Sequence, residues 1–230
     1  MKSVPELTFD QAMASLYGLA DPAVLATMTH FGSHPGQALG ISLPKLRALA
    51  DHHRQHELAL QLWQTGIHEA RLLASMVDDP QQVTRQQMES WVNDFDSWDV
   101  CDQVCGNLFD RTPWAVECAL AWSEREEEFV RRAGFVMMAE LAVHNKKMPD
   151  EAFLQFFPVM LRHVDDGRNF VRKAVNWALR QIGKRSPVLR QAAIEAANQI
   201  HQIDSPAARW IASDALREFA AKAAKEETDR

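Results

Sequence analysis

The sequence of 230 residues contains a single tyrosine and only three cysteines. It lacks any apolar run of the roughly 18 residues that a membrane-spanning helix needs. No apolar stretch follows the first residues, Met1 to Glu6, so no secretory signal is expected. An odd number of cysteines without an export signal indicates reduced thiols. A cytoplasmic protein without membrane association is therefore predicted.

Two of the three cysteines, Cys101 and Cys105, are one helical turn apart in the sequence, and the third is Cys118. This spacing places Cys101 and Cys105 on one face of a helix, where a pair of thiolates could bind a metal. No further cysteine or histidine lies at a matching spacing, so buried helical cysteines are the favoured interpretation. No metal site is predicted.

Strand signals are scarce as well, because no sustained polar and apolar alternation is bounded by Asn-Gly or Asp-Gly turns. Helical patterns dominate instead. Residues 129–143 have apolar side chains at helical spacing, and Ser123 with Glu126 resembles a capping box at the N-terminus of that helix. Pro158 falls inside the helical pattern of residues 151–164 and should kink or split that helix. An all-α fold is predicted.

The second half of the chain is punctuated by Pro113, Pro149 and Pro187, which recur at nearly even spacing. An interval of roughly 35–40 residues has room for two helices and two short turns, the unit of an α-solenoid. The segment 172–180 aligns with the segment 209–217, with identical side chains at four positions. One continuous domain is expected, with N-terminal helices in residues 1–82 and repeat units of about 83–112, 113–148, 149–186 and 187–224.

The net charge of −6 is unevenly distributed along the chain. Residues 1–110 hold 6 basic and 14 acidic side chains, residues 111–190 hold 14 and 10, and residues 191–230 hold 5 and 7. Stacked helix pairs form a concave surface from equivalent helices, and a row of cations there would suit a curved polyanion. The alternative is that these cations pair with acidic residues of neighbouring units or lie on solvated helix faces.

An aromatic and a carboxylate side chain, Trp98 and Asp102, are one turn apart in a predicted helix and share one face. An aromatic ring beside a carboxylate is a plausible site for a cationic, electron-poor substrate. Asp96 or Ser97 is the expected N-cap, and Asp99 faces another direction. From spacing alone, a buried Trp98 with Asp102 paired to an arginine is the simpler interpretation.

Four segments together resemble the AlkD-like DNA alkylation repair proteins: residues 40–47, 97–103, 129–133 and 175–180. They occur in the expected order, and the match runs from about residue 40 to 217. The resemblance implies HEAT-like repeats wrapped around duplex DNA. Active members of that family are monofunctional glycosylases that remove cationic N3- and N7-alkylated purines. The expected partner is thus double-stranded DNA with alkylated bases, bound by a monomer.

By this resemblance, Trp98, Asp102, Arg132 and Trp177 fall on functional positions. Asp102 would stabilise the oxocarbenium-like sugar and orient a water molecule. The two tryptophans would contact the sugar and the lesion, and Arg132 would hold a phosphate. A base that is already cationic needs no strong general acid, so no metal or cofactor is expected. Further contacts to the DNA backbone are expected from Arg131, Arg172, Lys173, Arg180, Lys184 and Arg185.

A second interpretation is a non-catalytic helical-repeat protein that binds DNA structures or a protein partner. Some relatives with this fold have lost glycosylase activity, so the resemblance supports DNA binding more strongly than catalysis. The segment before residue 40 matches only loosely, and the acidic first half is unusual for a protein that clamps DNA. The two interpretations share Arg132 and the basic helices and differ in the role of Asp102.

Overall fold

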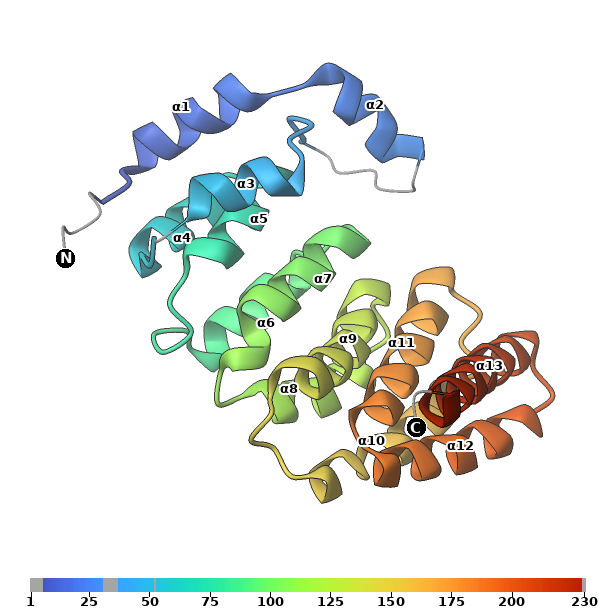
Figure 1. Ribbon diagram of the computed structural model, residues 1–230. Coiled ribbons are helices and arrows are strands. Elements are labelled where there is room, and N and C mark those ends of the chain that lie inside the picture. The colour runs from blue at the N-terminus through green and yellow to red at the C-terminus, as the bar shows by residue number, and fades with distance from the viewer. Residues whose placement is uncertain (1–5, 31–36, 52, 229–230) are drawn as a thin grey trace. The chain divides into compact units, whose positions relative to one another are not determined.

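The computed structural model describes residues 6–30, 37–51 and 53–228, and every regular element among them is helical (Figure 1). No strand occurs in these ranges, so the predicted all-α fold is confirmed. None of the helices in the same ranges combines the length and the apolar character that crossing a membrane requires.

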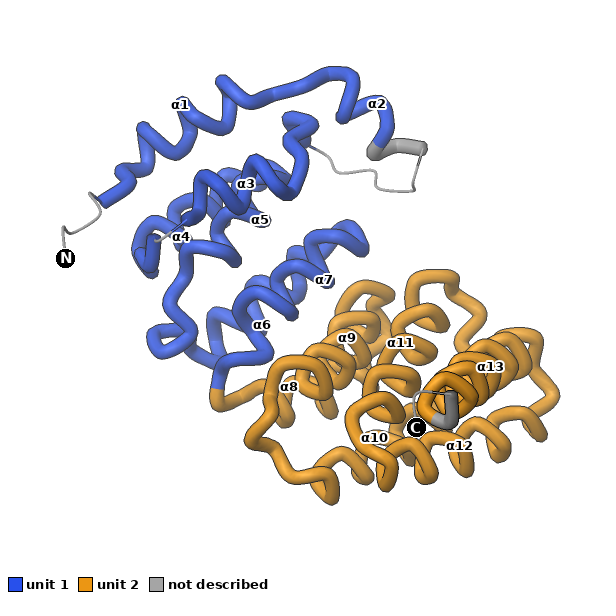
Figure 2. Tube along the Cα trace, in the orientation of Figure 1, with its two compact units in different colours: residues 1–112 blue, residues 113–230 orange. Residues whose placement is uncertain are grey.

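The chain divides into two compact units, Met1–Thr112 and Pro113–Arg230 (Figure 2). The division coincides with the boundary predicted between the repeat units of about 83–112 and 113–148. The expectation of one continuous domain stays a prediction.

Unit 1 contains seven α-helices and one short 3-10 helix among the residues that the structure describes. Helix α6 begins after Thr84, whose side chain accepts a hydrogen bond from the Gln87 amide at 3.1 Å. Helices α3, α4 and α7 all pack on α5. The bounds are α1 (Phe9–Leu19), α2 (Pro22–His30), α3 (Leu43–Ala50), α4 (His56–Gln64), α5 (His68–Val77), α6 (Arg85–Asn93), α7 (Trp98–Asn107) and η1 (Phe109–Arg111).

Unit 2 contains a helix pair in each of the three repeat units predicted from residue 113 onward. The second helices of these pairs pack in succession, α9 on α11 and α11 on α13. This arrangement confirms stacked helix pairs of the α-solenoid class. The bounds are α8 (Ala115–Ser123), α9 (Glu128–His144), η2 (Asp150–Phe153), α10 (Phe156–His163), α11 (Asn169–Arg185), α12 (Pro187–His201) and α13 (Pro206–Thr228).

The capping box predicted at Ser123 and Glu126 is wrong. Ser123 is the last residue of α8, and its hydroxyl donates to the Leu120 carbonyl at 2.8 Å. Helix α9 begins only at Glu128, with Glu127 at its N-cap. Ser123 is fully buried, because the backbone of α8 lies directly against Gly134 of α9. Tertiary packing therefore extends α8 through the residue that the local pattern assigned to a cap.

The expected interruption at Pro158 is confirmed as a split of the helix. Helix η2 ends at Phe153, and α10 begins at Phe156. Pro158 thus lies in the first turn of α10, where a backbone amide has no partner within the helix and its absence costs little.

Candidate functional site

Helix α7 carries the first two predicted site residues in unit 1. Trp98 is its first residue, and the buried Ser97 is its N-cap, in extended conformation. Trp98 and Asp102 are both half-buried and lie one turn apart on the same side of α7. The opposite side is buried and packs on α5. Trp98 and Asp102 therefore share one half-buried face of α7, as their spacing predicts, and their catalytic roles stay predictions.

The three cysteines lie in helix interiors facing the core. Cys101 and Cys105 belong to the buried side of α7, and Cys118 is buried in α8. All three are free thiols. The interpretation of these residues as buried helical cysteines is confirmed.

The first turn of α7 is joined to α5 by a buried histidine that no sequence motif indicated. His68 is 3% exposed, and its Nε2 lies 3.0 Å from Oδ2 of Asp99. Burial alone would lower the pKa of His68, but the adjacent Asp99 carboxylate outweighs it and the pKa is raised. Burial would likewise raise the pKa of Asp99, yet the His68 contact lowers it. The Asp99 carboxylate thus contacts α5 from the first turn of α7.

Residues 40–47, one of the four segments that resemble the family, lie next to the pair of His68 and Asp99 and have a structural role there. Gly40 has a φ of 75°, a conformation that glycine adopts without strain. A side chain there would come within 2.7 Å of the Leu25 amide nitrogen. The buried Glu69 carboxylate accepts hydrogen bonds from the amides of Gly40 at 2.7 Å and Ile41 at 3.2 Å. The segment is thus anchored next to His68, and its last residue, Arg47, reaches Gln103 of α7 at 3.5 Å.

Unit 2 carries the other two predicted catalytic residues on adjacent, packed helices. Arg132 of α9 is only 6% exposed, and its Nη1 donates to the Phe170 carbonyl in the first turn of α11 at 2.6 Å. Trp177 of α11 is half-buried. Arg132 therefore joins α9 to α11, and its assignment as a phosphate ligand stays a prediction.

Four of the six predicted backbone-binding cations have acidic partners within unit 2. Arg131 lies 2.8 Å from Asp166, and Lys184 lies 2.9 Å from Glu218. Arg180 contacts Asp214 and Glu218, while Arg185 contacts Asp150 and the carbonyls of Ala142 and Met148. Three of the four cations pair with acids of a neighbouring repeat, as the alternative predicts, whereas Arg185 pairs with Asp150 of its own repeat unit. The DNA-binding roles of these four side chains stay predictions.

The remaining two cations lie at the start of α11 and behave differently. Lys173 is exposed. The guanidinium of Arg172 lies over the ring of Trp210, 5.1 Å from its centroid. This short stretch of α11 is where unit 2 offers positive charge beside an aromatic surface.

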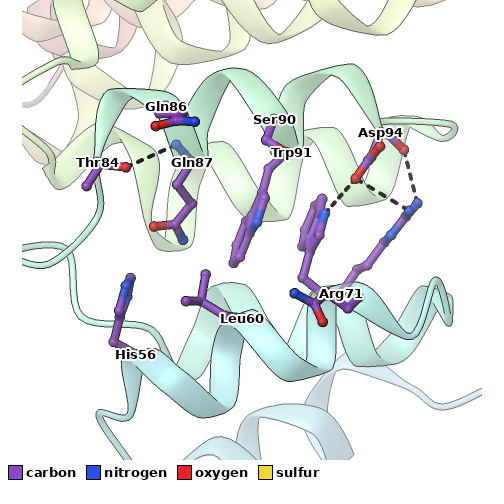
Figure 3. Close-up of a pocket in the computed structure, with 11 residues that line it drawn as sticks. His56, Leu60, Arg71, Thr84, Gln86, Gln87, Ser90, Trp91 and Asp94 are labelled. Atoms are coloured by element: carbon purple, nitrogen blue, oxygen red, sulfur yellow. Dashed lines mark hydrogen bonds and ion pairs between the residues drawn. The ribbon is translucent and has the colours of Figure 1, made fainter.

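A cleft of about 450 Å³ lies between α4 and α6 in unit 1 (Figure 3). Its floor includes the stacked rings of Trp63 and Trp91, whose centroids are 4.0 Å apart. Asp94 accepts from Trp63 Nε1 at 2.8 Å and, through its carbonyl, from Arg71 at 3.0 Å. Neither Trp98 nor Asp102 lines this cleft. Because none of the four predicted catalytic residues lines this cleft, the face of α7 that carries Trp98 and Asp102 stays the candidate site.

The stacked helix pairs define a helical-repeat protein of the α-solenoid class. A model of the family described as DNA alkylation repair enzyme matches residues 12–219. The chain therefore belongs to the DNA alkylation repair enzyme family, which confirms the resemblance drawn from four short segments. The match also begins earlier than residue 40, and it includes most of α1.

Two relatives are distant in sequence, but the similarity extends over most of the chain. The Listeria innocua protein Lin0241 is 24% identical over 203 residues, with 86% of this chain and 88% of that protein covered. Lmo0209 of Listeria monocytogenes is 22% identical with the same coverage. A solved structure from a family described as related to the HEAT-like repeat DNA glycosylases, with affinity for branched DNA structures, superposes with a TM-score of 0.72. It is 20% identical, and the alignment covers 92% of this chain and 95% of that one. This likeness establishes the HEAT-like fold.

Proposed function

We propose that this protein is a DNA glycosylase that hydrolyses the N-glycosidic bond of cationic N3- and N7-alkylated purines in duplex DNA. Membership of the DNA alkylation repair enzyme family supports a role in this chemistry. The observation that carries the proposal is the placement of Trp98 and Asp102 one turn apart on the accessible face of α7. The proposed enzyme acts as a monomer in the cytoplasm and uses no metal or cofactor.

The chemistry assigned to α7 follows from the charge of the lesion. An alkylated purine is cationic before cleavage, so its glycosidic bond breaks with development of positive charge on the sugar. In this proposal the carboxylate of Asp102 stabilises that charge and orients the attacking water, as carboxylates do in other glycoside-cleaving enzymes. The ring of Trp98, one turn earlier, offers a π face to a cationic base or sugar.

The roles of Trp177 and Arg132 rest on the resemblance alone. Trp177 is assigned to the sugar and lesion, and Arg132 to a phosphate. The burial of Arg132 and its hydrogen bond to the Phe170 carbonyl give it a structural role in any case. A loss of activity on replacing Arg132 would therefore not by itself identify a phosphate contact.

The decisive experiment is release of 7-methylguanine and 3-methyladenine from methylated duplex DNA, measured by chromatography. The wild-type protein is expected to release both bases. Asp102→Asn should lower the single-turnover rate by about two to three orders of magnitude, the usual cost of losing one electrostatic stabiliser of a transition state. DNA affinity should be retained, because the change adds no negative charge.

The matched control is Asp96→Asn, which removes the same charge from the loop just before α7. Asp96 makes only a 3.8 Å ion pair with Arg71, and 47% of its side chain is exposed. Pairs of this kind contribute little to stability, so its base release should equal that of the wild type. Unchanged release by Asp102→Asn would rule out the role assigned to Asp102.

A second candidate function is a non-catalytic protein that binds DNA structures. The observation that favours it is the structural likeness to a family described as having affinity for branched DNA structures. Tight binding to DNA without base release from any methylated substrate would support this candidate. Absence of DNA binding even at low salt, where phosphate contacts are strongest, would exclude both and leave a protein-binding scaffold.

A further inference from the structure

The exposed ring of Trp210 in unit 2 has no part in the proposed catalysis. Trp210 lies in the second turn of α13 and is 37% exposed, a large value for a tryptophan in a repeat with a well-buried core. The Arg172 guanidinium from α11 lies over the ring, 5.1 Å from its centroid. Trp210 is thus an aromatic surface held in place by a cation rather than a core residue.

The position of Trp210 follows from the internal repeat. When the segment 172–180 is aligned with 209–217, Trp210 of α13 corresponds to Lys173 of α11, and Arg209 corresponds to Arg172. Helices α11 and α13 pack on each other. The start of α11 therefore contributes two cations, Arg172 and the exposed Lys173. The start of α13 contributes an aromatic ring at the position of the repeat that is equivalent to Lys173.

A nucleobase is the ligand whose chemistry matches this combination. Every base has a π face that stacks on an aromatic side chain, and its phosphate is attracted to adjacent cations, as in proteins that bind single strands. A base within an intact duplex has both faces covered by its neighbours, so it cannot stack on a protein ring. The surface would therefore select an unpaired nucleotide.

We propose that Trp210, backed by Arg172 and flanked by Lys173, is a stacking site for an unpaired nucleobase of DNA. This inference rests on the proposed DNA-binding function and adds a substrate feature to it. The protein would bind DNA that has a single-stranded flap or end more tightly than blunt duplex of the same length. The site is independent of Asp102 and of cleavage.

The alternative is that Arg172 and Trp210 only join α11 to α13. A cation–π contact of this kind is weak at an exposed position, so its loss would lower stability slightly and affect all DNA ligands alike. The test must therefore separate selectivity for unpaired bases from general affinity and from stability.

The experiment compares binding of dye-labelled blunt duplex and of the same duplex with a ten-nucleotide thymidine flap, by fluorescence anisotropy at low salt. The wild-type protein should prefer the flapped DNA. Trp210→Leu should weaken binding to the flap by about 5- to 100-fold, the range for one base–aromatic contact, and leave binding to blunt duplex nearly unchanged. Trp210→Phe should retain most of the preference, because a phenyl ring still stacks.

The matched control is Trp114→Leu, since Trp114 lies in the same unit and is also 37% exposed. It should bind both ligands as the wild type does. Thermal melting of each variant checks that the fold is intact. Equal affinity of the wild type for blunt and flapped DNA, or an equal loss for both in Trp210→Leu, would overturn the stacking site while DNA binding stands. Failure of the wild type to bind either DNA would overturn the proposed function together with this inference.

Discussion

The Nε2 atom of His68 on α5 lies 3.0 Å from Oδ2 of Asp99 in the first turn of α7. His68 is 3% exposed, so this contact is made in the interior of unit 1. It joins to α5 the first turn of α7, which begins with Trp98 and precedes the turn of Asp102. The pair therefore positions the proposed catalytic face without belonging to it.

Replacing His68 by leucine should destabilise the protein by about 2–4 kcal/mol at pH 5.5, because it leaves a largely buried carboxylate without its partner. Because the pKa of His68 is raised in the folded state, its full contribution to stability is present below the ordinary histidine pKa. This contribution is lost as the pH rises through the folded-state pKa of His68. Because the pKa of Asp99 is lowered in the folded state, its full contribution to stability is present above the ordinary aspartate pKa and is lost on acidification. The decrease in the free energy of unfolding that His68→Leu causes should therefore be smaller at pH 9 than at pH 5.5, as measured by urea unfolding.

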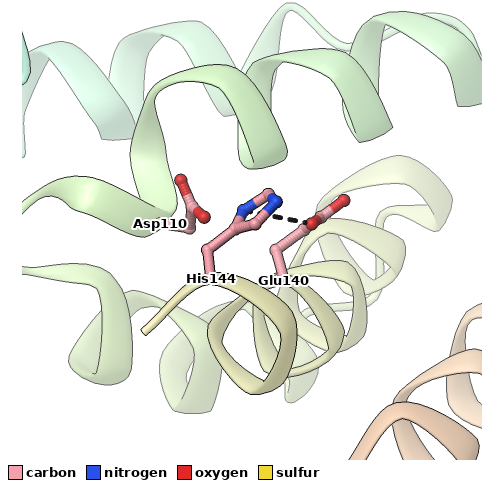
Figure 4. Close-up of side chains that lie close together, drawn as sticks. All are labelled: Asp110, Glu140 and His144. Carbon is pink, nitrogen blue, oxygen red and sulfur yellow. Dashed lines mark ion pairs between the residues drawn. The ribbon is translucent and has the colours of Figure 1, made fainter. Parts of the chain in front are cut away.

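His144 provides the control for this prediction. It lies on α9 with 43% of its side chain exposed, and its Nδ1 is 3.5 Å from Oε2 of Glu140 one turn earlier (Figure 4). The Glu140 side chain is 13% exposed, so the pair is only partly exposed. Helical pairs of this spacing contribute about 0.3–0.5 kcal/mol, so His144→Leu should cost much less than His68→Leu at pH 5.5. A loss in His68→Leu that is the same at pH 5.5 and pH 9 would contradict the ion pair.

The repeat pattern was predictable from sequence because its signals are local. Evenly spaced prolines bracket the helix pairs, and the core faces follow from helical periodicity. The place of Trp98 and Asp102 on one face of α7 was predictable for the same reason, since their spacing in the sequence corresponds to one helical turn.

The contacts that join different helices could not be predicted in this way. His68 and Asp99 are far apart in the sequence, and a lone histidine carries no periodic signal. Arg132 resembles a surface cation in the sequence, but its bond to the Phe170 carbonyl places it in the interior. Both depend on which helices pack together, and that information is absent from any short window of sequence.

Asp166 forms an acid-sensitive link in unit 2. Its carboxylate accepts from Arg131 at 2.8 Å and from Arg168 at 2.6 Å. Burial would raise the pKa of Asp166, but the two guanidinium groups outweigh it and lower the pKa to about 2. A lowered pKa stabilises the folded state above the ordinary aspartate value, and this contribution is lost as the pH falls toward about 2.

Asp166→Asn should consequently lower the unfolding free energy at pH 7 by about 1–3 kcal/mol, a range that allows for partial solvent screening. The difference from the wild type should shrink steadily below pH 4. The neighbouring Asp165 is exposed, so Asp165→Asn should have no comparable effect at either pH. Urea unfolding at pH 7 and pH 3 provides the comparison, and a difference that grows on acidification would show that the sign is wrong.

The contact between α8 and α9 depends on the absence of a side chain at Gly134. A Cβ atom at this position would lie 2.7 Å from the Cα of Ser123, nearer still to the Ser123 nitrogen, and 2.9 Å from the Ala119 carbonyl oxygen. All three are backbone atoms, so no rotamer change can relieve the clash. Gly134→Ala must push the two helices apart, and overpacking of this kind costs about 1–3 kcal/mol or more. The gain in helix propensity, about 1 kcal/mol, offsets only part of this cost.

Two other helical glycines provide controls for the loss of stability expected in Gly134→Ala. Gly18 in α1 has nothing within 4 Å of an added Cβ, so Gly18→Ala should be neutral or stabilise by up to about 1 kcal/mol. Gly183 in α11 faces the ring of Phe219, whose Cζ would be 2.5 Å from the new carbon. The Cβ of Ala193 would also lie 2.8 Å away and can move only with its backbone. The Phe219 ring can shift, whereas all the contacts at Gly134 are with backbone, so Gly183→Ala should fall between the other two. In urea unfolding, Gly18→Ala should therefore have the highest free energy of unfolding, Gly183→Ala an intermediate one and Gly134→Ala the lowest. If Gly134→Ala proved as stable as Gly18→Ala, α8 and α9 could not be packed backbone against backbone, and the buried position of Ser123 would have to be revised with them.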